Sequence, residues 1–385
     1  MMLCVLGRQP ALGLAELESL YGAANVFPAG TNCALVDGDI DFNRLGGTVK
    51  AGRLLTTISG TNPQKALNWL QKNVAENIET TEGKLKLGVS LYGFEMHPQK
   101  INANALSLKK ALRSTGQSVR VIPNNETALS SAQTYQYNLH KDGGCELLIV
   151  KSGGDTLIAR LTNVQDLNAY TVRDRERPKR DAFVGMLPPK LAQTIINLAS
   201  AQSSPTGTLL DPFCGTGVVL QEALLMGFQV YGTDNNEKMI DYSRKNLEWL
   251  ASIREMSIDP RLETADATDH VWRQPLNVIA CEGYLGHPFN TEPSPAALKE
   301  TMMTCNIIMK KFLTNIASQI ESGTRLCIAA PAWFVKGQSH HLPVVENLEN
   351  TGYDRVAFRH SKPQDLIYHR SDQVVGRELL VLVKK

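Results

Sequence analysis

The sequence predicts an α/β protein whose second half forms a mainly parallel, doubly wound sheet. From residue 185 onward, short apolar segments alternate with amphipathic helical segments, as strands and helices do in such sheets. The apolar segments are almost continuous, which is typical of strands covered by helices on both faces. The 385 residues, of which 43% are hydrophobic and 20% charged, suffice for roughly two to three packed domains.

The first half of the chain predicts smaller α+β units. Helical and alternating apolar spacings follow one another there, and Gly and Asp residues mark the turns between them. In the helix at 103–114, Leu106, Leu108, Ala111 and Leu112 are expected to face inward. We expect strands at 2–6, 34–36, 86–92, 118–122, 145–151 and 155–162, and helices at 11–21, 62–77, 103–114 and 128–138.

A charged connector separates the two halves. Residues 170–181 read YTVRDRERPKRD, and their mixed charges and Pro178 predict an exposed linker, or else a loop that touches a phosphate backbone. After it the alternation continues to the end of the chain. We expect helices at 190–200, 217–226, 237–252, 294–320 and 343–350, and strands at 207–210, 229–233, 277–281, 325–330, 355–360 and 378–383.

Composition limits the function classes. The formal net charge of +2 excludes a protein that binds polyanions by bulk charge, although a local basic patch stays open. The seven cysteines show no C-x-x-C spacing, so neither a disulfide framework nor a zinc knuckle is expected. The adjacent His340 and His341 point apart, so they predict no metal site. Without a signal peptide or a membrane-spanning apolar stretch, the chain is expected to be cytoplasmic.

The most informative segment is a glycine-rich turn between a strand and a helix, with the sequence DPFCGTG. Gly215 and Gly217 permit positive φ angles and a close approach of the backbone to a ligand. A phosphate-binding turn has a third glycine, but Leu220 stands at that place, and Asp211 opens the turn. A carboxylate there suits a ligand with an ammonium group, and S-adenosylmethionine (SAM) fits this description.

Two further acids follow the next two strands. Asp234 ends the segment VYGTD, where a carboxylate can accept both hydroxyls of a ribose. Asp266 follows the third strand, where a carboxylate can accept from the exocyclic amine of adenine. Because neighbouring parallel strands end at one crevice, Asp211, Asp234 and Asp266 are predicted to bind one nucleoside ligand.

These residues amount to a family resemblance. DPFCGTG, with Glu222 and Ala223 after it, resembles the first motif of the THUMP-containing tRNA guanosine N2-methyltransferases, the tRNA guanosine-10 family. Three further segments are similar to other parts of that family and occur along this chain in the family's order. They are LGRQPALGLAELESLYG, GMLPPKLAQ and YHRSDQVVGRE. The resemblance implies a ferredoxin-like module at 1–75, a THUMP-like RNA-binding domain at 76–165, a linker at 166–184 and a Rossmann-like SAM-dependent methyltransferase domain at 185–385.

The resemblance also implies ligands and partners. SAM is the expected cofactor and tRNA the expected partner, held at its acceptor end by the THUMP module. Some relatives need a small activator subunit, and this point stays open here, as do the target nucleotide and the number of methyl groups added. SAM contacts are implied at Asp211, Phe213, Gly215, Asp234 and Asp266, with Gly217 in the same turn. RNA contacts are expected at Lys109, Lys110, Arg113, Arg173 and Arg175.

The fourth motif departs from the family pattern. The family has Asp-Pro-Pro-Tyr or Asn-Pro-Pro-Tyr after the fourth strand, where oxygens accept from the target amine and the aromatic ring stacks on a flipped base. Here Glu282 stands for the acid, Gly283 replaces a rigid proline and Tyr284 comes one position early. We expect Glu282 to accept the amine proton through a longer and more flexible side chain than Asp, and Tyr284, or Phe289, to stack on the base.

Several interpretations stay open at this stage. The divergent fourth motif also suits an RNA-binding protein that retains the fold with lost or altered catalysis. An amino-methylase that acts on DNA, rRNA or protein is a second alternative, against which the THUMP-like first half argues. A nucleotide-dependent oxidoreductase is disfavoured, because the third glycine is absent and Asp211 opens the turn.

Overall fold

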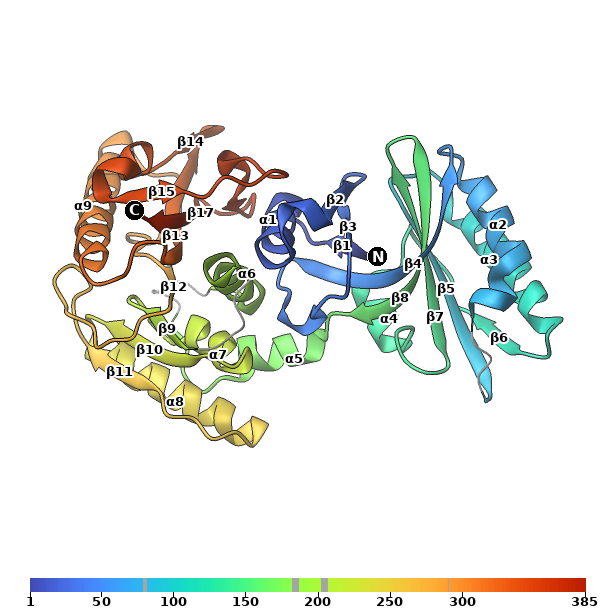
Figure 1. The fold of residues 1–385 in the computed structure, drawn as a ribbon, viewed down its shortest axis with the longest axis horizontal. Helices are drawn as coiled ribbons and strands as arrows, with labels where there is room; N and C mark the ends of the chain where they lie inside the picture. The colour runs from blue at the N-terminus through green and yellow to red at the C-terminus, as the bar shows by residue number, and fades with distance from the viewer. Residues whose placement is uncertain (79–81, 182–186, 202–206, 290) are drawn as a thin grey trace. The chain divides into compact units, whose positions relative to one another are not determined.

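The computed structural model describes residues 1–78, 82–181, 187–201, 207–289 and 291–385 (Figure 1). By its internal contacts the chain divides into two compact units. The first consists of Met1–Pro10, Ala24–Asn43 and Gly47–Asn168, and the second of Ala11–Ala23, Arg44–Gly46 and Ala169–Lys385. Among the described residues, no helix is both long and apolar enough to cross a membrane.

The first unit is built on one mixed sheet with the strand order β2-β3-β1-β4-β8-β7-β5-β6. β5 pairs in parallel with β6 and β7, and the other pairs are antiparallel. The strands are β1 (Met2–Leu6), β2 (Val26–Ala29), β3 (Cys33–Val36), β4 (Thr48–Ser59), β5 (Lys84–Tyr92), β6 (Ser118–Val121), β7 (Gly144–Ser152) and β8 (Asp155–Val164). The helices are α2 (Pro63–Asn77), α3 (Pro98–Arg113) and α4 (Ser131–Gln136).

The long strand β4 joins the two predicted modules of the first half. It pairs with β1 on one side and with β8 on the other, so the sheet runs without a break past the predicted boundary at residue 75. That boundary, and the THUMP identity of residues 76–165, stay predictions. β4 was not predicted from the sequence, because Lys50 interrupts its apolar pattern.

Helix α3 corrects one prediction about the core. Leu108 and Leu112 are buried as expected, whereas Leu106 is 50% exposed and faces solvent. The helix begins at Pro98, five residues before the predicted start, and His97 caps it. The inward stripe is therefore formed by Ile101, Ala105, Leu108 and Leu112, spaced four, three and four residues apart.

A buried ion pair explains why Lys50 is tolerated inside β4. Its Nζ lies 2.6 Å from Oε1 of Glu146 in β7, and it also donates to the carbonyl of Leu129 at 2.8 Å. The Glu146 carboxylate further accepts from the hydroxyls of Ser90 and Thr134, each at 2.6 Å. Burial lowers the pKa of Lys50, and Glu146 opposes that shift. The pair ties β4, β5 and β7 together.

The second unit is a doubly wound α/β layer, as predicted. Its sheet has the order β11-β10-β9-β12-β13-β17-β15, parallel from β11 to β13, with β17 antiparallel to β13. The short strands β14 (Gln338–His340) and β16 (Ile367–Tyr368) pair with β13 and β17. The main strands are β9 (Thr208–Asp211), β10 (Gln229–Asp234), β11 (Arg261–Thr264), β12 (Val278–Glu282), β13 (Arg325–Val335), β15 (Tyr353–Arg355) and β17 (Val375–Lys384).

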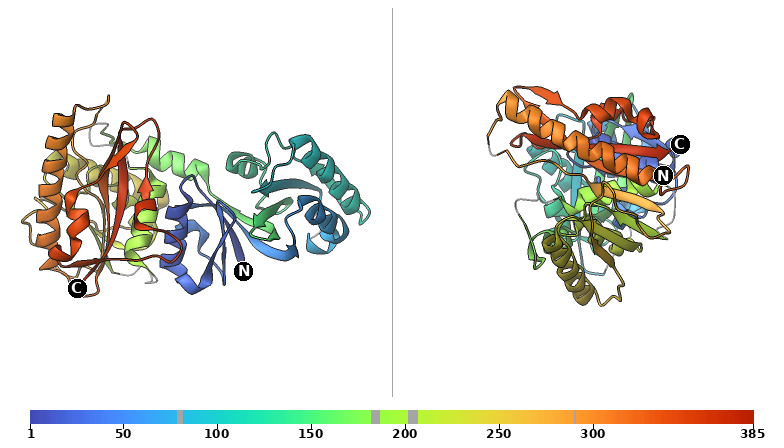
Figure 2. Two further views of the ribbon diagram at one scale, coloured as in Figure 1. Left: turned by 90° about the horizontal axis from the view of Figure 1, so that it is seen from above. Right: turned by 90° about the vertical axis from the view of Figure 1, so that its left-hand side faces the viewer.

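Helices cover both faces of this sheet (Figure 2). α6 (Pro189–Ser200), α7 (Val218–Leu225) and α8 (Glu237–Arg254) pack with α1 (Pro10–Tyr21) in one apolar layer. α9 (Pro295–Ala317) forms the other layer through residues such as Phe312 and Leu313. Two predictions near the end of the chain were wrong in detail. Residues after Arg355 leave the sheet, and Pro343–Thr351 is a kinked 3₁₀ segment rather than an α-helix.

The connector is only partly the exposed linker that was expected, since Arg173 and Arg177 are buried in it and Arg175 and Arg180 are exposed. It forms α5 (Leu167–Thr171) and a π-helical turn, Val172–Glu176. The guanidinium of Arg173 is buried and holds both carboxylate oxygens of Glu222 in α7, at 2.6 and 3.2 Å. The predicted boundary at residues 184 and 185 lies outside the described residues.

The buried pair in the first unit yields a stability prediction. We expect Glu146→Ala to lower the free energy of unfolding by about 3–5 kcal/mol, because it leaves the Lys50 ammonium buried without its counter-charge. The exposed Asp39, 3.7 Å from Arg53 in the same unit, serves as the control, and Asp39→Ala should cost less than about 1 kcal/mol. Urea denaturation measures both, and equal losses would contradict the interpretation.

Candidate functional site

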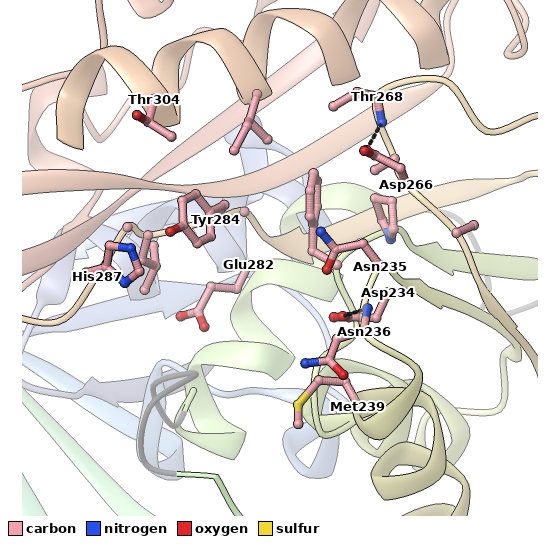
Figure 3. A pocket seen from close by; sticks show the side chains of 18 of the residues that line it. Asp234, Asn235, Asn236, Met239, Asp266, Thr268, Glu282, Tyr284, His287 and Thr304 are labelled. Atoms are coloured by element: carbon pink, nitrogen blue, oxygen red, sulfur yellow. Dashed lines mark hydrogen bonds between the residues drawn. The ribbon is translucent and has the colours of Figure 1, made fainter. Parts of the chain in front are cut away.

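A pocket of about 540 Å³ opens at the carboxyl ends of the parallel strands in the second unit (Figure 3). It lies where the strand order reverses between β9 and β12, which is where open α/β sheets bind their ligands. A smaller recess of about 30 Å³ adjoins the glycine-rich turn, and Phe213 and Glu282 line both spaces. Residues of the larger pocket include Asp234, Asn236, Asp266, Thr268, Glu282, Tyr284, His287 and Thr304.

The glycine-rich turn is held by hydrogen bonds and close contacts from α8. Gly215 and Gly217 have φ angles of 52° and 83°, which favour glycine. A Cβ at Gly217 would lie 2.9 Å from Oγ of Ser243 in α8, and the same Oγ donates to the carbonyl of Gly215 at 2.8 Å. The Asn246 amide donates to the carbonyls of Thr216 and of the connector. Helix α8 therefore sets the path of the turn.

Asp211 is buried below this turn, with 1% of its surface exposed. Its Oδ1 accepts from the backbone N–H of Phe213 at 3.1 Å, and the residue lines the smaller recess. Burial raises the pKa of Asp211 well above its ordinary value, and the charges of Asp234 and Glu282 raise it further. A cationic group bound in the recess would favour the ionised form.

Asp234 ends β10 and Asp266 follows β11, as the sequence predicted. The Asp234 oxygens accept from the backbone N–H groups of Gly215 at 3.0 Å and Asn236 at 2.9 Å. Burial raises the pKa of Asp234, and these two hydrogen bonds oppose the shift. Asp266 accepts from the N–H of Thr268 at 2.9 Å. Each carboxylate oxygen retains a lone pair that can accept a ligand hydroxyl or amine.

The predicted cofactor residues therefore gather around one crevice. Phe213 lines both spaces and packs its ring edge-on against Phe312, at 5.1 Å between centroids. Gly217 lines neither space, and instead caps the start of α7.

Glu282, at the end of β12, lies beside Tyr284 on the pocket wall (Figure 3). Its Oε1 accepts from Nε of Arg377 in β17, a residue that the sequence analysis did not identify. Burial raises the pKa of Glu282, and Arg377 opposes that shift. Tyr284 is 37% exposed, whereas Phe289 packs against the apolar layer that contains α9, so the geometry favours Tyr284 as the aromatic platform.

The loop after Glu282 is held more firmly than its glycines suggested. The N–H of Gly283 donates to the carbonyl of Ala329 at 3.0 Å. Gly286 has a φ of 81°, and a Cβ there would lie 2.5 Å from Cγ2 of Thr301 in α9. The loop therefore packs closely on α9 at Gly286 and is hydrogen-bonded to β13 at Gly283.

The predicted RNA contacts separate into two groups. Lys109 is half-buried, and Lys110 and Arg113 are exposed near the C-terminal end of α3 in the first unit. Arg175 is exposed in the π-helical turn. Arg173 was wrongly predicted, because its guanidinium is engaged by Glu222 and only 6% of the residue is exposed.

Two protein families match parts of the chain. Residues 177–331 match the family described as an RMKL-like methyltransferase domain. Residues 85–245 match a family described as a DNA methylase, in a stretch that begins in β5 of the first unit and ends in α8 of the second. This second match spans parts of both compact units rather than one of them.

Curated relatives and a solved structure agree with the first match. The chain is 30% identical over 175 residues to the tRNA (guanine(10)-N2)-dimethyltransferase of Methanothermobacter thermautotrophicus, covering 46% of this chain and 47% of the relative. It is 33% identical over 151 residues to the enzyme of that name from Pyrococcus abyssi, covering 38% and 40%. The matches thus span less than half the length of these relatives.

The crystal structure of TrmN from Thermus thermophilus shares the fold. Its TM-score is 0.53 at 19% identity, and the similarity covers 100% of both chains. Together with the family match, this confirms the methyltransferase fold of the second unit. The curated relatives agree with the resemblance to tRNA guanosine N2-methyltransferases, whose THUMP module stays a prediction for this chain.

The close packing of Gly286 yields a second prediction. Gly286→Ala should lower the free energy of unfolding by about 1–3 kcal/mol, because it combines a positive φ with a steric clash against Thr301. Gly323 has a similar φ of 85°, and no atom lies within 4 Å of the position that a Cβ would take there. Gly323→Ala therefore measures the backbone strain alone. If the two variants unfold at the same urea concentration, Thr301 does not constrain the loop.

Proposed function

We propose that this chain is a SAM-dependent RNA methyltransferase that methylates the exocyclic N2 amine of a guanosine in tRNA. One observation carries the proposal: Asp211, Asp234 and Asp266 follow successive strands around a crevice that also holds Glu282 and Tyr284. The first three residues match the chemistry of a cationic nucleoside, and the last two match that of a target amine and base.

The residues present fit SAM in charge and in hydrogen-bonding capacity. Asp211 is a buried carboxylate that forms no ion pair with any of the described residues, and a ligand ammonium would supply the missing positive charge. Asp234 and Asp266 offer acceptors for ribose hydroxyls and for an adenine amine. Bound SAM would supply an electrophilic methyl carbon, whose bond to sulfur breaks as the amine nitrogen bonds to it, leaving S-adenosylhomocysteine.

Glu282 supplies the complementary chemistry at the target amine. An acceptor on one N–H orients the amine and draws electron density onto nitrogen, and the proton released from the amine passes to this carboxylate. Glu282 lines both the recess that holds Asp211 and the larger pocket that holds Asp234 and Asp266, so it adjoins the proposed cofactor position. Tyr284 offers the face of an exposed ring on which a base removed from its stack can rest.

The nature of the substrate rests on the relatives and on the first unit. The curated relatives are named for tRNA and for the N2 position of a guanine. The exposed Lys110 and Arg113 on α3 can contact the phosphate backbone, with Arg175 in the connector. All seven cysteines are free and buried, which suits action in the reducing cytoplasm.

The test of this function is the nucleoside content of tRNA. Incubation of unmodified tRNA transcripts with the purified chain and SAM should yield N2-methylguanosine or its dimethyl form, detected by mass spectrometry after digestion. A product formed by the chain alone would show that no activator subunit is required. Methylation of adenosine instead would contradict the proposed target.

Loss of the ribose acceptor should weaken cofactor binding. We expect Asp234→Ala to raise the Kd for SAM by about 10-fold or more, because a charged hydrogen-bond acceptor contributes roughly 1.5–3 kcal/mol. Asp241→Ala, on the exposed face of α8, is the matched control and should leave the Kd unchanged. Isothermal titration calorimetry measures both values, and equal Kd values for the two variants would exclude Asp234 from the site.

Removal of the amine acceptor should separate binding from chemistry. Glu282→Ala should reduce methyl transfer by about 100-fold or more, since a positioned proton acceptor contributes this much. Its Kd for SAM should stay within about threefold of the wild type. Radiolabelled methyl transfer and calorimetry on one preparation provide both values. Unchanged turnover would exclude Glu282 as the acceptor.

A further inference from the structure

The Glu282 carboxylate is held by a residue from a distant strand. Arg377 lies in β17, opposite Pro331 of β13 and Tyr368 of β16, so its backbone is fixed on both sides. Its Nε donates to Oε1 of Glu282, and the two side chains are 9% and 14% exposed. No hydrogen bond to the second oxygen, Oε2, is found among the described residues, and Glu282 lines the pocket.

Other groups near this carboxylate are mostly acidic or neutral. Asp211 at the end of β9 interacts electrostatically with Glu282 and with Asp234 at the end of β10, and both charges raise the pKa of Asp211. Cys281 on its own strand and Cys305 on α9 are buried thiols whose pKa values burial raises, so they stay uncharged. His287 and Tyr284 belong to the same pocket wall. Within the part of the chain that the structure describes, Arg377 is the cation in ion-pair contact with Glu282.

We propose that Arg377 is a positioning residue that fixes Oε1 of Glu282, so that Oε2 faces the target amine from an ionised carboxylate. The inference rests on the proposed function. A Glu side chain has one more rotatable bond than the Asp expected at this position, and the ion pair removes that freedom. The contact thus replaces the constraint that a rigid proline after the acid would provide.

The ion pair also determines which form of Glu282 meets the amine. Only the ionised carboxylate accepts a proton, whereas the protonated acid presents an O–H donor instead. Burial favours the protonated form of Glu282, and Arg377 opposes this. Without Arg377 the pKa of Glu282 therefore rises, and the acceptor form appears only at higher pH.

The test compares Arg377→Met with Arg377→Lys. At pH 7 the Met variant should methylate tRNA at least about 10-fold more slowly in kcat, with a Kd for SAM near that of the wild type. The acidic limb of its pH–rate profile should move to higher pH by about one unit or more. A shift of one pH unit corresponds to a tenfold change in the ionised fraction of Glu282, which matches the tenfold loss in kcat. The Lys variant keeps the charge and should recover part of both losses.

Arg355→Met is the matched control. Arg355 lies 2.9 Å from Glu378, the residue after Arg377 on β17, and this pair lines neither pocket. Its loss removes an arginine–glutamate pair that joins β15 to β17, so it reproduces any general weakening of β17. We expect the pH–rate profile of this variant to match the wild type.

A second measurement is independent of turnover. Carbon-13 NMR of glutamate side-chain carboxyls, assigned to Glu282 by comparison with Glu282→Gln, follows the titration in the protein without ligands. In Arg377→Met the midpoint should move to higher pH. An unmoved midpoint, or a loss of kcat that is equal at every pH, would overturn the role of Arg377. The wild type could also fail to methylate tRNA while the midpoint of Arg377→Met still lies at higher pH than that of the wild type. That result would contradict the proposed substrate and leave the positioning contact intact.

Discussion

The gathering of acidic side chains at one edge of a parallel sheet constrains the rest of the second unit. Burial raises the pKa values of Asp211, Asp234 and Glu282 and disfavours their ionised forms, and the charges of the other two raise the pKa of Asp211 further. A different group opposes the pKa shift of each carboxylate. Backbone N–H groups of the glycine-rich turn and the next loop hold the two aspartates, and Arg377 holds Glu282. Such a site is arranged for a ligand that brings positive charge.

The glycine-rich turn can bind a ligand only if its backbone stays in one conformation, and side chains of α8 provide this. Ser243 and Asn246 donate to carbonyls of the turn, and Asn246 also binds the connector through Lys179. The connector is further tied to α7 by Arg173 and Glu222. The connector is thus part of the support of the site, and the burial of Arg173 removes that residue from the predicted RNA contacts.

The first unit depends on a comparable buried pair. Lys50 and Glu146 join strands from the two modules that the sequence suggested, and the hydroxyls of Ser90 and Thr134 complete the hydrogen bonding of the carboxylate. A charge in an otherwise apolar strand is stable there because its partner arrives from another strand. The same fact explains why the strand was missed: the partner lies 96 residues away.

Local patterns were enough to predict the alternating strands and helices, the glycine-rich turn and the acids Asp211, Asp234 and Asp266. These features depend on spacings of a few residues, because strand and helix periods and the ends of parallel strands are short-range properties. The partners of charged groups depended on the tertiary structure alone. Arg377 meets Glu282 across 95 residues and Arg173 meets Glu222 across 49, and no local pattern marks such pairs. They form because burial of a charge in a low-dielectric interior requires an opposite charge, wherever in the chain that charge resides.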